Sequence, residues 1–325
     1  MTYNVGGLIE ATDYNGFVST NVGANVNATW GTGTTSAGYG QTALSTVAAG
    51  STVTATAWAS LVNTVAAMAN HQGTTITSRS APVTGNTITV LNAVNTDVTN
   101  CYNNRGNAVA QGSQFTGWSG TNSKTTATSG ATWTITFVNT VTFASADAAR
   151  YFFNAGGSIK IDVSKTATGQ TGDPEWNDLA NTLCGDIYIT GGAATQTIAG
   201  TAYTGTTKIG GTGTPTTLLT TTGWFDLTTS DTVVYKQFAD TAPYTNNFIQ
   251  HALRTAGSGT QLVITTTWSA SDTNPTSGAD PITGGTAASG ATPGTAPCTI
   301  VTYYPPSTTY LSASWGTPTV AATVS

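Results

Sequence analysis

The pattern of hydrophobic and polar positions changes about a third of the way along the chain, from a helical period to an alternating one. The clearest helical stripe lies in TAWASLVNTVAAMANHQG, where Trp58, Leu61 and Val65 fall on one face of a helix. Gly73 follows this stripe as a C-terminal stop signal. A weaker stripe upstream follows Thr12, a possible N-cap, and another runs downstream through LNAVNTDVTNCY. We therefore predict three helices in series.

After about residue 112, apolar residues alternate with threonine, serine or lysine, which is the pattern of strands with one buried and one solvated face. Threonine suits such strands because its branched side chain packs on a pleated surface while its hydroxyl stays hydrated. We predict an α+β fold, mainly β, in which an N-terminal helical region precedes an antiparallel β-sandwich. The segments that carry the alternation are ATWTITFV, SIKIDVS, DIYIT, DTVVYKQF, NNFIQHAL, QLVITTTWS and CTIVTYY.

These patterns divide the chain into three segments. Residues 1–111 are predicted to form the helical region, and residues 112–271 the β-sandwich domain. Residues 272–325 read as a Gly/Thr/Pro-rich loop followed by C-terminal strands that complete or extend the β-domain. Within the β-region, DPEWNDLANTL predicts a short helix, with Asp173 as its cap and Pro174 as its first residue.

The segment SADAARYFFNAGGSIKIDVS predicts a helix that turns directly into a strand. Ser145 is placed to cap the helix, and Phe152 and Phe153 would then face the sheet. In the following strand, Ile159 and Ile161 share one face. Together with the stripe described first, the residues predicted to have a structural role are Trp58, Leu61, Val65, Phe152, Phe153, Ile159 and Ile161.

Composition narrows the classes of function. Only 7% of the residues are Asp, Glu, Lys or Arg, while 38% are hydrophobic, so uncharged polar residues and glycine must form the solvated surface. Nine basic residues spread over 325 positions cannot neutralise a run of phosphates, and no nucleic-acid partner is expected. No stretch approaches the roughly 20 apolar residues that span a bilayer, so no membrane insertion is expected. The first residues, MTYNVGGLIE, lack the pattern of a signal peptide, which predicts synthesis in the cytoplasm.

Candidate catalytic side chains are scarce. His71 and His251 could act as bases, but their places in a last helical turn and in a strand favour structural roles. Glu10 and Glu175 are the only glutamates, so a two-carboxylate glycosidase would have to rely on aspartates. We predict no catalytic residue, no metal site and no cofactor. Three widely spaced cysteines fit neither a disulfide framework nor a zinc site and predict free, buried thiols, at Cys101, Cys184 and Cys298.

The tryptophans allow two interpretations. If several were exposed on one face, they would form a platform for carbohydrate, whereas in a chain so poor in charge they more simply anchor the core. The second interpretation is favoured, and glycan binding stays open as an alternative. The residues concerned are Trp118, Trp133, Trp176, Trp224, Trp268 and Trp315.

The order of several motifs resembles that in virion structural proteins of tailed bacteriophages. The matching segments are DYNGFVSTNV, GYGQ, ATAWASLVNTVAAMANHQG, TFASADAARYFFNAGGSIKIDVS, DPEWNDL, GWFDLTTSDTVVYKQF, YTNNFIQHAL and GTQLVITTTWS. They cover the helical region and most of the β-region, and they leave about the last fifty residues unmatched. The resemblance implies a non-enzymatic component of the particle, associated with the tail, its baseplate or its fibres, and it carries over no active-site residue.

We therefore expect a structural subunit of a tailed-phage virion, with other virion proteins and copies of itself as partners. A surface with few charges can form large contacts with little repulsion or desolvation penalty, which favours repetitive assembly. Two alternatives remain open: a head decoration or collar protein, and a fibre module that binds a receptor or a host surface glycan. A polysaccharide-degrading enzyme is disfavoured by the scarcity of glutamate.

Overall fold

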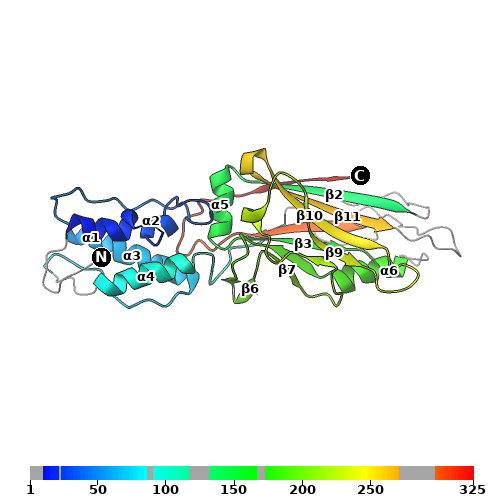
Figure 1. The fold of residues 1–325 in the computed structure, drawn as a ribbon, viewed down its shortest axis with the longest axis horizontal. Coiled ribbons are helices and arrows are strands. Elements are labelled where there is room, and N and C mark those ends of the chain that lie inside the picture. Colours follow the sequence, from blue (N-terminus) through cyan, green and yellow to red (C-terminus); the bar gives the residue numbers. More distant parts are fainter. Residues whose placement is uncertain (1–9, 22, 86–90, 117–131, 167–172, 271–296) are drawn as a thin grey trace.

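The structure is a computed structural model that describes residues 10–21, 23–85, 91–116, 132–166, 173–270 and 297–325. The first four α-helices of the chain gather at one end of an elongated molecule, and the strands form the other end (Figure 1). The strand ladders of the described residues are antiparallel throughout. The predicted α+β, mainly β fold with an N-terminal helical region is thus confirmed.

The longest helix, α3 (Ala55–Gln72), follows the predicted stripe. Its N-cap Thr54 accepts a hydrogen bond from a backbone N–H of the first turn at 3.1 Å, and Gly73 ends it with a left-handed φ of 71°. The three stripe residues, Trp58, Leu61 and Val65, are buried in the main core. The other elements of this end are α1 (Ala11–Asn15), the π-helical η1 (Gly16–Thr20), α2 (Val26–Thr29) and α4 (Leu91–Asn103).

Thr12 does not cap the first helix, so that part of the prediction is wrong. α1 begins at Ala11 with Glu10 as its N-cap, and the Asp13 carboxylate accepts a hydrogen bond from the Glu10 backbone N–H at 3.2 Å. The Thr12 hydroxyl donates to the Glu10 carboxylate at 3.3 Å. An acidic residue at the third helical position therefore satisfies the donor at the helix start, and the helix begins before Thr12.

The long segment between α2 and α3 contains no helix or strand, and two asparagine side chains hold it. Asn27 donates to the Leu44 carbonyl at 2.9 Å and accepts from the Leu44 N–H at 2.8 Å. Asn15 makes the same pair of bonds with Val47, at 2.8 Å each. Each side-chain amide thus takes the place of a neighbouring strand, because it satisfies both backbone groups of one residue.

Two sheets form the other end of the molecule. The five-stranded sheet has the order β1 (Phe115–Thr116), β12 (Cys298–Tyr304), β3 (Ser158–Ser164), β4 (Asp186–Ile189), β7 (Thr206–Ile209). The six-stranded sheet has the order β13 (Thr319–Val324), β2 (Trp133–Thr142), β11 (Gln261–Ala270), β10 (Phe248–Ala256), β9 (Thr232–Phe238), β8 (Thr217–Leu218). A separate hairpin consists of β5 (Gln196–Ile198) and β6 (Thr201–Tyr203). Single turns of 3-10 helix are η3 (Trp224–Asp226) and η4 (Gly257–Gly259).

The sandwich buries one shared core. Alternate residues of β2 are buried, including Ile135 and Phe137, and Ile159 and Ile161 of β3 belong to the same core. Lys160 lies on the opposite face of β3, where it pairs with an aspartate of β4 at 3.3 Å. The alternation of β3 predicted from SIKIDVS is therefore confirmed, since its apolar residues turn inward and its lysine does not.

A short helix closes the far end of the sandwich. α6 (Asp173–Asp178) continues as the π-helical η2 (Leu179–Cys184), and η2 contacts strands of both sheets. Trp176 of α6 packs in the core, with its ring tilted against those of Trp133, at 4.8 Å, and Trp268, at 5.9 Å. Asp173 belongs to the helix rather than preceding it as the predicted cap.

The helix α5 (Ala146–Asn154) lies between the two ends of the molecule (Figure 1). Its predicted cap is confirmed, because the Ser145 hydroxyl accepts from the Ala148 N–H at 3.0 Å. Phe152 and Phe153 are fully buried, and Phe153 stacks on a tryptophan ring of η3 at 5.1 Å. Gly156 then turns the chain into β3 with a φ of 86°.

The C-terminal segment joins both sheets. β12 is inserted between β1 and β3, and β13 pairs with β2 at the edge of the other sheet. Between these two strands the chain returns to the helical end, where Leu311 and Trp315 are buried in the main core.

Candidate functional site

Motifs that are far apart in the sequence meet where the helical end joins the sandwich. The Tyr39 hydroxyl, from GYGQ, donates to the Arg105 carbonyl at 2.7 Å and accepts from the Gln72 side chain, of HQG, at 2.7 Å. From AARYFFNAGG, Asn154 donates to the Gly38 carbonyl at 3.0 Å. Three of the motifs that carry the family resemblance therefore build one junction.

His71 is part of this junction. Its Nε2 lies 2.9 Å from the carbonyl oxygen of Ala155, just after α5, and its ring packs edge-on against Tyr39 at 5.4 Å. Burial lowers the pKa of His71, and the bond to the carbonyl opposes that shift. The predicted structural role for this histidine fits this geometry, although its partner is a carbonyl of another element rather than of its own helix.

Arg150 and Gln41 tie further segments to the junction. The Arg150 guanidinium donates to the carbonyls of Thr32 and Ala37, at 2.7 Å each. Gln41 donates to the Ser312 carbonyl at 2.9 Å and accepts from the Ser312 N–H at 2.8 Å. The C-terminal segment is thereby attached to the helical end by the same pairwise bonding that Asn15 and Asn27 use.

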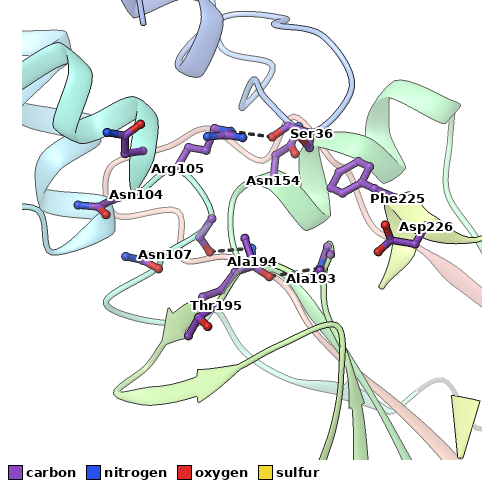
Figure 2. Close-up of a pocket in the computed structure, with 15 residues that line it drawn as sticks. Ser36, Asn104, Arg105, Asn107, Asn154, Ala193, Ala194, Thr195, Phe225 and Asp226 are labelled. Carbon is purple, nitrogen blue, oxygen red and sulfur yellow. Dashed lines mark hydrogen bonds between the residues drawn. The ribbon is translucent and has the colours of Figure 1, made fainter. Parts of the chain in front are cut away.

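A cavity of about 260 Å³ opens at the edge of the junction. Figure 2 shows its walls: Asn104, Arg105 and Asn107 after α4, the 193–195 loop before β5, and the tip of η3. The residues that line it are Ser36, Asn103, Asn104, Arg105, Gly106, Asn107, Asn154, Gly191, Gly192, Ala193, Ala194, Thr195, Gln196, Phe225 and Asp226. Its lining is rich in amide side chains, and no pattern described above predicted this cavity. The run NNRGN at 103–107 is the one local signal that could have indicated it.

The charges at the cavity are one cation and one carboxylate. Arg105 donates through Nε to the Ser36 carbonyl at 2.9 Å and through Nη1 to the Tyr102 carbonyl at 2.8 Å. Its guanidinium lies 4.5 Å from the centre of the Tyr102 ring. Asp226, on the opposite wall, accepts a hydrogen bond from the Gly223 N–H at 2.9 Å. These bonds hold both charged groups in place at the rim.

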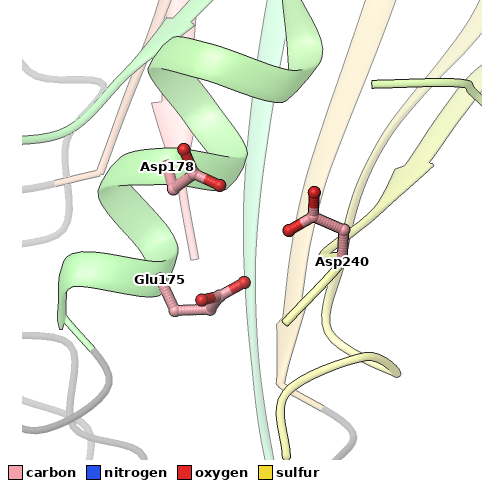
Figure 3. Close-up of side chains that lie close together, drawn as sticks. All are labelled: Glu175, Asp178 and Asp240. Carbon is pink, nitrogen blue, oxygen red and sulfur yellow. The ribbon is translucent and has the colours of Figure 1, made fainter. Parts of the chain in front are cut away.

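Three carboxylates gather at the far end of the sandwich. Glu175 and Asp178 of α6 face Asp240, which follows β9, and their oxygens lie within 4.8 Å of one another (Figure 3). Carboxylates are ligands for hard cations, but Ca²⁺ takes six to eight oxygens. The cluster supplies three such residues and could hold a cation only with further oxygens from water or backbone.

The remaining candidate groups for catalysis are enclosed in the core. His251 is buried, its Nδ1 lies 2.9 Å from the Thr266 hydroxyl, and burial lowers its pKa to about 3. The predicted free, buried thiols are confirmed, and burial raises the pKa of each to about 12, at Cys101, Cys184 and Cys298. These thiols therefore stay protonated and unreactive at neutral pH.

The tryptophan platform is wrong for the residues that can be placed. Five of the six tryptophans considered are buried: Trp133, Trp176, Trp224, Trp268 and Trp315. Trp118 lies outside the described residues. The rings of Trp133 and Trp268 both pack against Trp176, and the ring of Trp224 stacks on Phe153 of α5, since burial removes large apolar surfaces from water.

Among the described residues, no helix has both the length and the apolar character to cross a membrane. Comparisons of the chain with known protein families, with curated proteins and with solved structures give no match.

Proposed function

We propose that this chain is a non-enzymatic structural subunit of a tailed-phage virion, associated with the tail, its baseplate or its fibres. Its partners are copies of itself and other virion proteins, which it contacts through β-rich surfaces of low charge. The resemblance of its motif order to such proteins motivates the proposal. The observation that carries it is the edge strand β13.

β13 has the properties of a strand that a neighbouring chain can extend. It is the edge of the six-stranded sheet, and no strand of the described residues pairs with its outer side. Its sequence, TVAATV, contains no charged residue and no proline, and no Asp, Glu, Lys or Arg follows residue 280. Edge strands of monomeric proteins are usually protected by lysine, proline or a bulge, because their free N–H and C=O groups recruit other strands.

The other sheet edges differ from β13. β8 is two residues long, the described part of β1 ends at Thr116, and β7 carries Lys208. On β13, Thr319, Ala321 and Thr323 are exposed, so a strand added there would meet small side chains with little desolvation cost. Backbone hydrogen bonds would supply the affinity, as in other cases of strand addition.

Enclosure of the described histidines and cysteines in the core supports a non-enzymatic role. A general base or nucleophile must reach its substrate, and His251 and the three thiols have no such access.

Mass spectrometry of purified particles tests the proposal. We expect the chain in the particle at a copy number that matches one of the symmetries of the tail, and a density map of the intact particle should place β13 against a neighbour. A position on the head or collar would replace the tail assignment by the alternative, and absence of the chain from the particle would overturn the proposal.

A further inference from the structure

Asn154 is a fixed part of the wall of the junction cavity. Asn154 is 2% exposed and donates through Nδ2 to the Gly38 carbonyl. Its Oδ1 is buried, and no hydrogen-bond partner for this atom exists among the described residues. Because that oxygen has almost no accessible surface, the acceptors that a ligand can reach lie elsewhere in the lining.

The rest of the lining offers both donors and acceptors. Arg105 uses Nε and one Nη1 hydrogen for carbonyls, which leaves further N–H groups. Asn107 accepts the Thr197 N–H through Oδ1 at 2.8 Å, which leaves its amide hydrogens. Asp226 uses one carboxylate oxygen for the Gly223 N–H, which leaves the other as an acceptor. A hydroxyl group both donates and accepts, so several hydroxyls match this set better than a pure donor or a pure acceptor does.

The charge of the lining and the volume of the cavity further limit the kind of molecule that it could bind. One cation, Arg105, and one carboxylate, Asp226, lie in the lining, so the cavity favours a molecule without net charge. An anion would meet a single arginine, and a metal ion a single carboxylate. The volume of about 260 Å³ is below the roughly 300 to 1,000 Å³ of sites for drug-sized ligands, which fits one ring. The half-buried ring of Phe225 adds an apolar face for C–H groups.

We propose that this cavity binds one sugar ring, or a neutral polyol of similar size, between the Arg105–Asn107 turn and the Phe225–Asp226 tip. The site is independent of the assembly role proposed above. It also differs from the tryptophan platform considered from the sequence, because amide side chains and one phenylalanine build it.

Titration followed by NMR tests the site. D-glucose, D-galactose, D-mannose and N-acetyl-D-glucosamine are added to the ¹⁵N-labelled full chain, and the signals of Asn107, Asn154 and Gln196 are followed. We expect at least one of these sugars to shift the three signals with a saturable, millimolar dissociation constant. Methyl glycosides distinguish a free sugar from the end of a glycan, because in both a methyl glycoside and a glycan the anomeric hydroxyl is substituted. Affinity equal to that of the free sugar indicates the end of a glycan, and loss of affinity indicates a free sugar.

Two matched variants locate the binding. Ala194 lies on the exposed rim, so Ala194→Trp should fill the cavity and weaken binding at least tenfold. Ala202→Trp places the same ring on the exposed face of β6, outside the cavity, and should leave the dissociation constant unchanged. The proposal is overturned if none of the four sugars binds saturably, if Ala194→Trp binds as wild type does, or if inorganic phosphate binds more tightly than every sugar.

Discussion

The two ends of the molecule satisfy their backbone in different ways. In the sandwich, β2 pairs along its length with β11 on one side and over residues 137–142 with β13 on the other, so ladders satisfy these peptide groups. In the helical end, Asn15, Asn27 and Gln41 each hold both backbone groups of one distant residue. Side-chain amides thus satisfy, in the helical end, the kind of backbone group that neighbouring strands satisfy in the sandwich.

This comparison implies that the two ends depend on different kinds of residue. The stability of the sandwich depends mainly on its buried apolar side chains, because the ladders between strands satisfy its backbone groups. Individual amide side chains matter in the helical end, because each has no substitute nearby. We therefore expect substitutions of buried apolar residues to affect the sandwich most, and substitutions of single amide residues to affect the helical end most.

The largest effect is expected where both ends share one core. Phe152→Ala and Phe153→Ala each remove a fully buried ring of α5. Each should lower the free energy of unfolding by about 3 to 5 kcal/mol. Denaturant unfolding measures this change, with Tyr310→Ala, at a 44% exposed position, as the control. Soluble yield and incorporation into particles should fall together. Normal stability with loss of host attachment alone would mean that the segment is a recognition surface.

The buried histidine of the sandwich, His251, should make the free energy of unfolding depend on pH. Burial places the pKa of His251 at about 3, below the value near 6.5 of an unfolded histidine, so its contribution to stability is complete above about pH 6.5 and is lost as the pH falls toward 3. His251→Gln should therefore reduce the loss of unfolding free energy between pH 6.5 and 5 by about 2 kcal/mol. Denaturant unfolding of wild type and variant at both pH values measures this, and an unchanged difference between them would contradict it.

A smaller and local effect is expected from the amide of Asn27. Asn27→Ala leaves the half-buried N–H and carbonyl of Leu44 to water, which should cost about 1 kcal/mol. Hydrogen exchange should accelerate in the segment between α2 and α3 and stay unchanged in β2 and β11. Asn95→Ala, at an exposed position of α4, serves as the control. Faster exchange in β2 and β11 as well would contradict the prediction that the effect of Asn27→Ala stays in the helical end.

Substitutions in β13 should have the smallest effect on the free energy of unfolding. They should have a large effect on incorporation into particles. Ala321→Lys and Thr323→Lys place charges on exposed positions of this edge strand, so the free energy of unfolding should change by less than about 0.5 kcal/mol. Incorporation into particles should nevertheless fall, because lysine protects an edge against strand addition. Thr201→Lys, at an exposed position of β6, is the control. Normal incorporation of both β13 variants would remove the observation that carries the proposed function.

Local signals in the sequence were sufficient for much of the fold. The stripe of Trp58, Leu61 and Val65, the cap at Ser145 and the alternation in SIKIDVS all act between residues at most a few positions apart. The start of α1 was misplaced although it is equally local, because a carboxylate at Asp13 performs the capping that a hydroxyl usually performs. The seven residues predicted to be structural are all buried.

By itself, the sequence determined the longest helix α3, the helix α5, seven of the strands and the α+β class, since periodicity and caps depend on near neighbours. Only the tertiary structure decided which distant groups meet. Gln41 bonds Ser312 across 271 positions, and Asn154 reaches Gly38 across 116. Amide side chains carry no periodic signal, and their partners are set by the closure of the whole chain around the core. The junction and its cavity therefore arise from the packing of the two ends, and the run NNRGN at 103–107 is the one local signal of them.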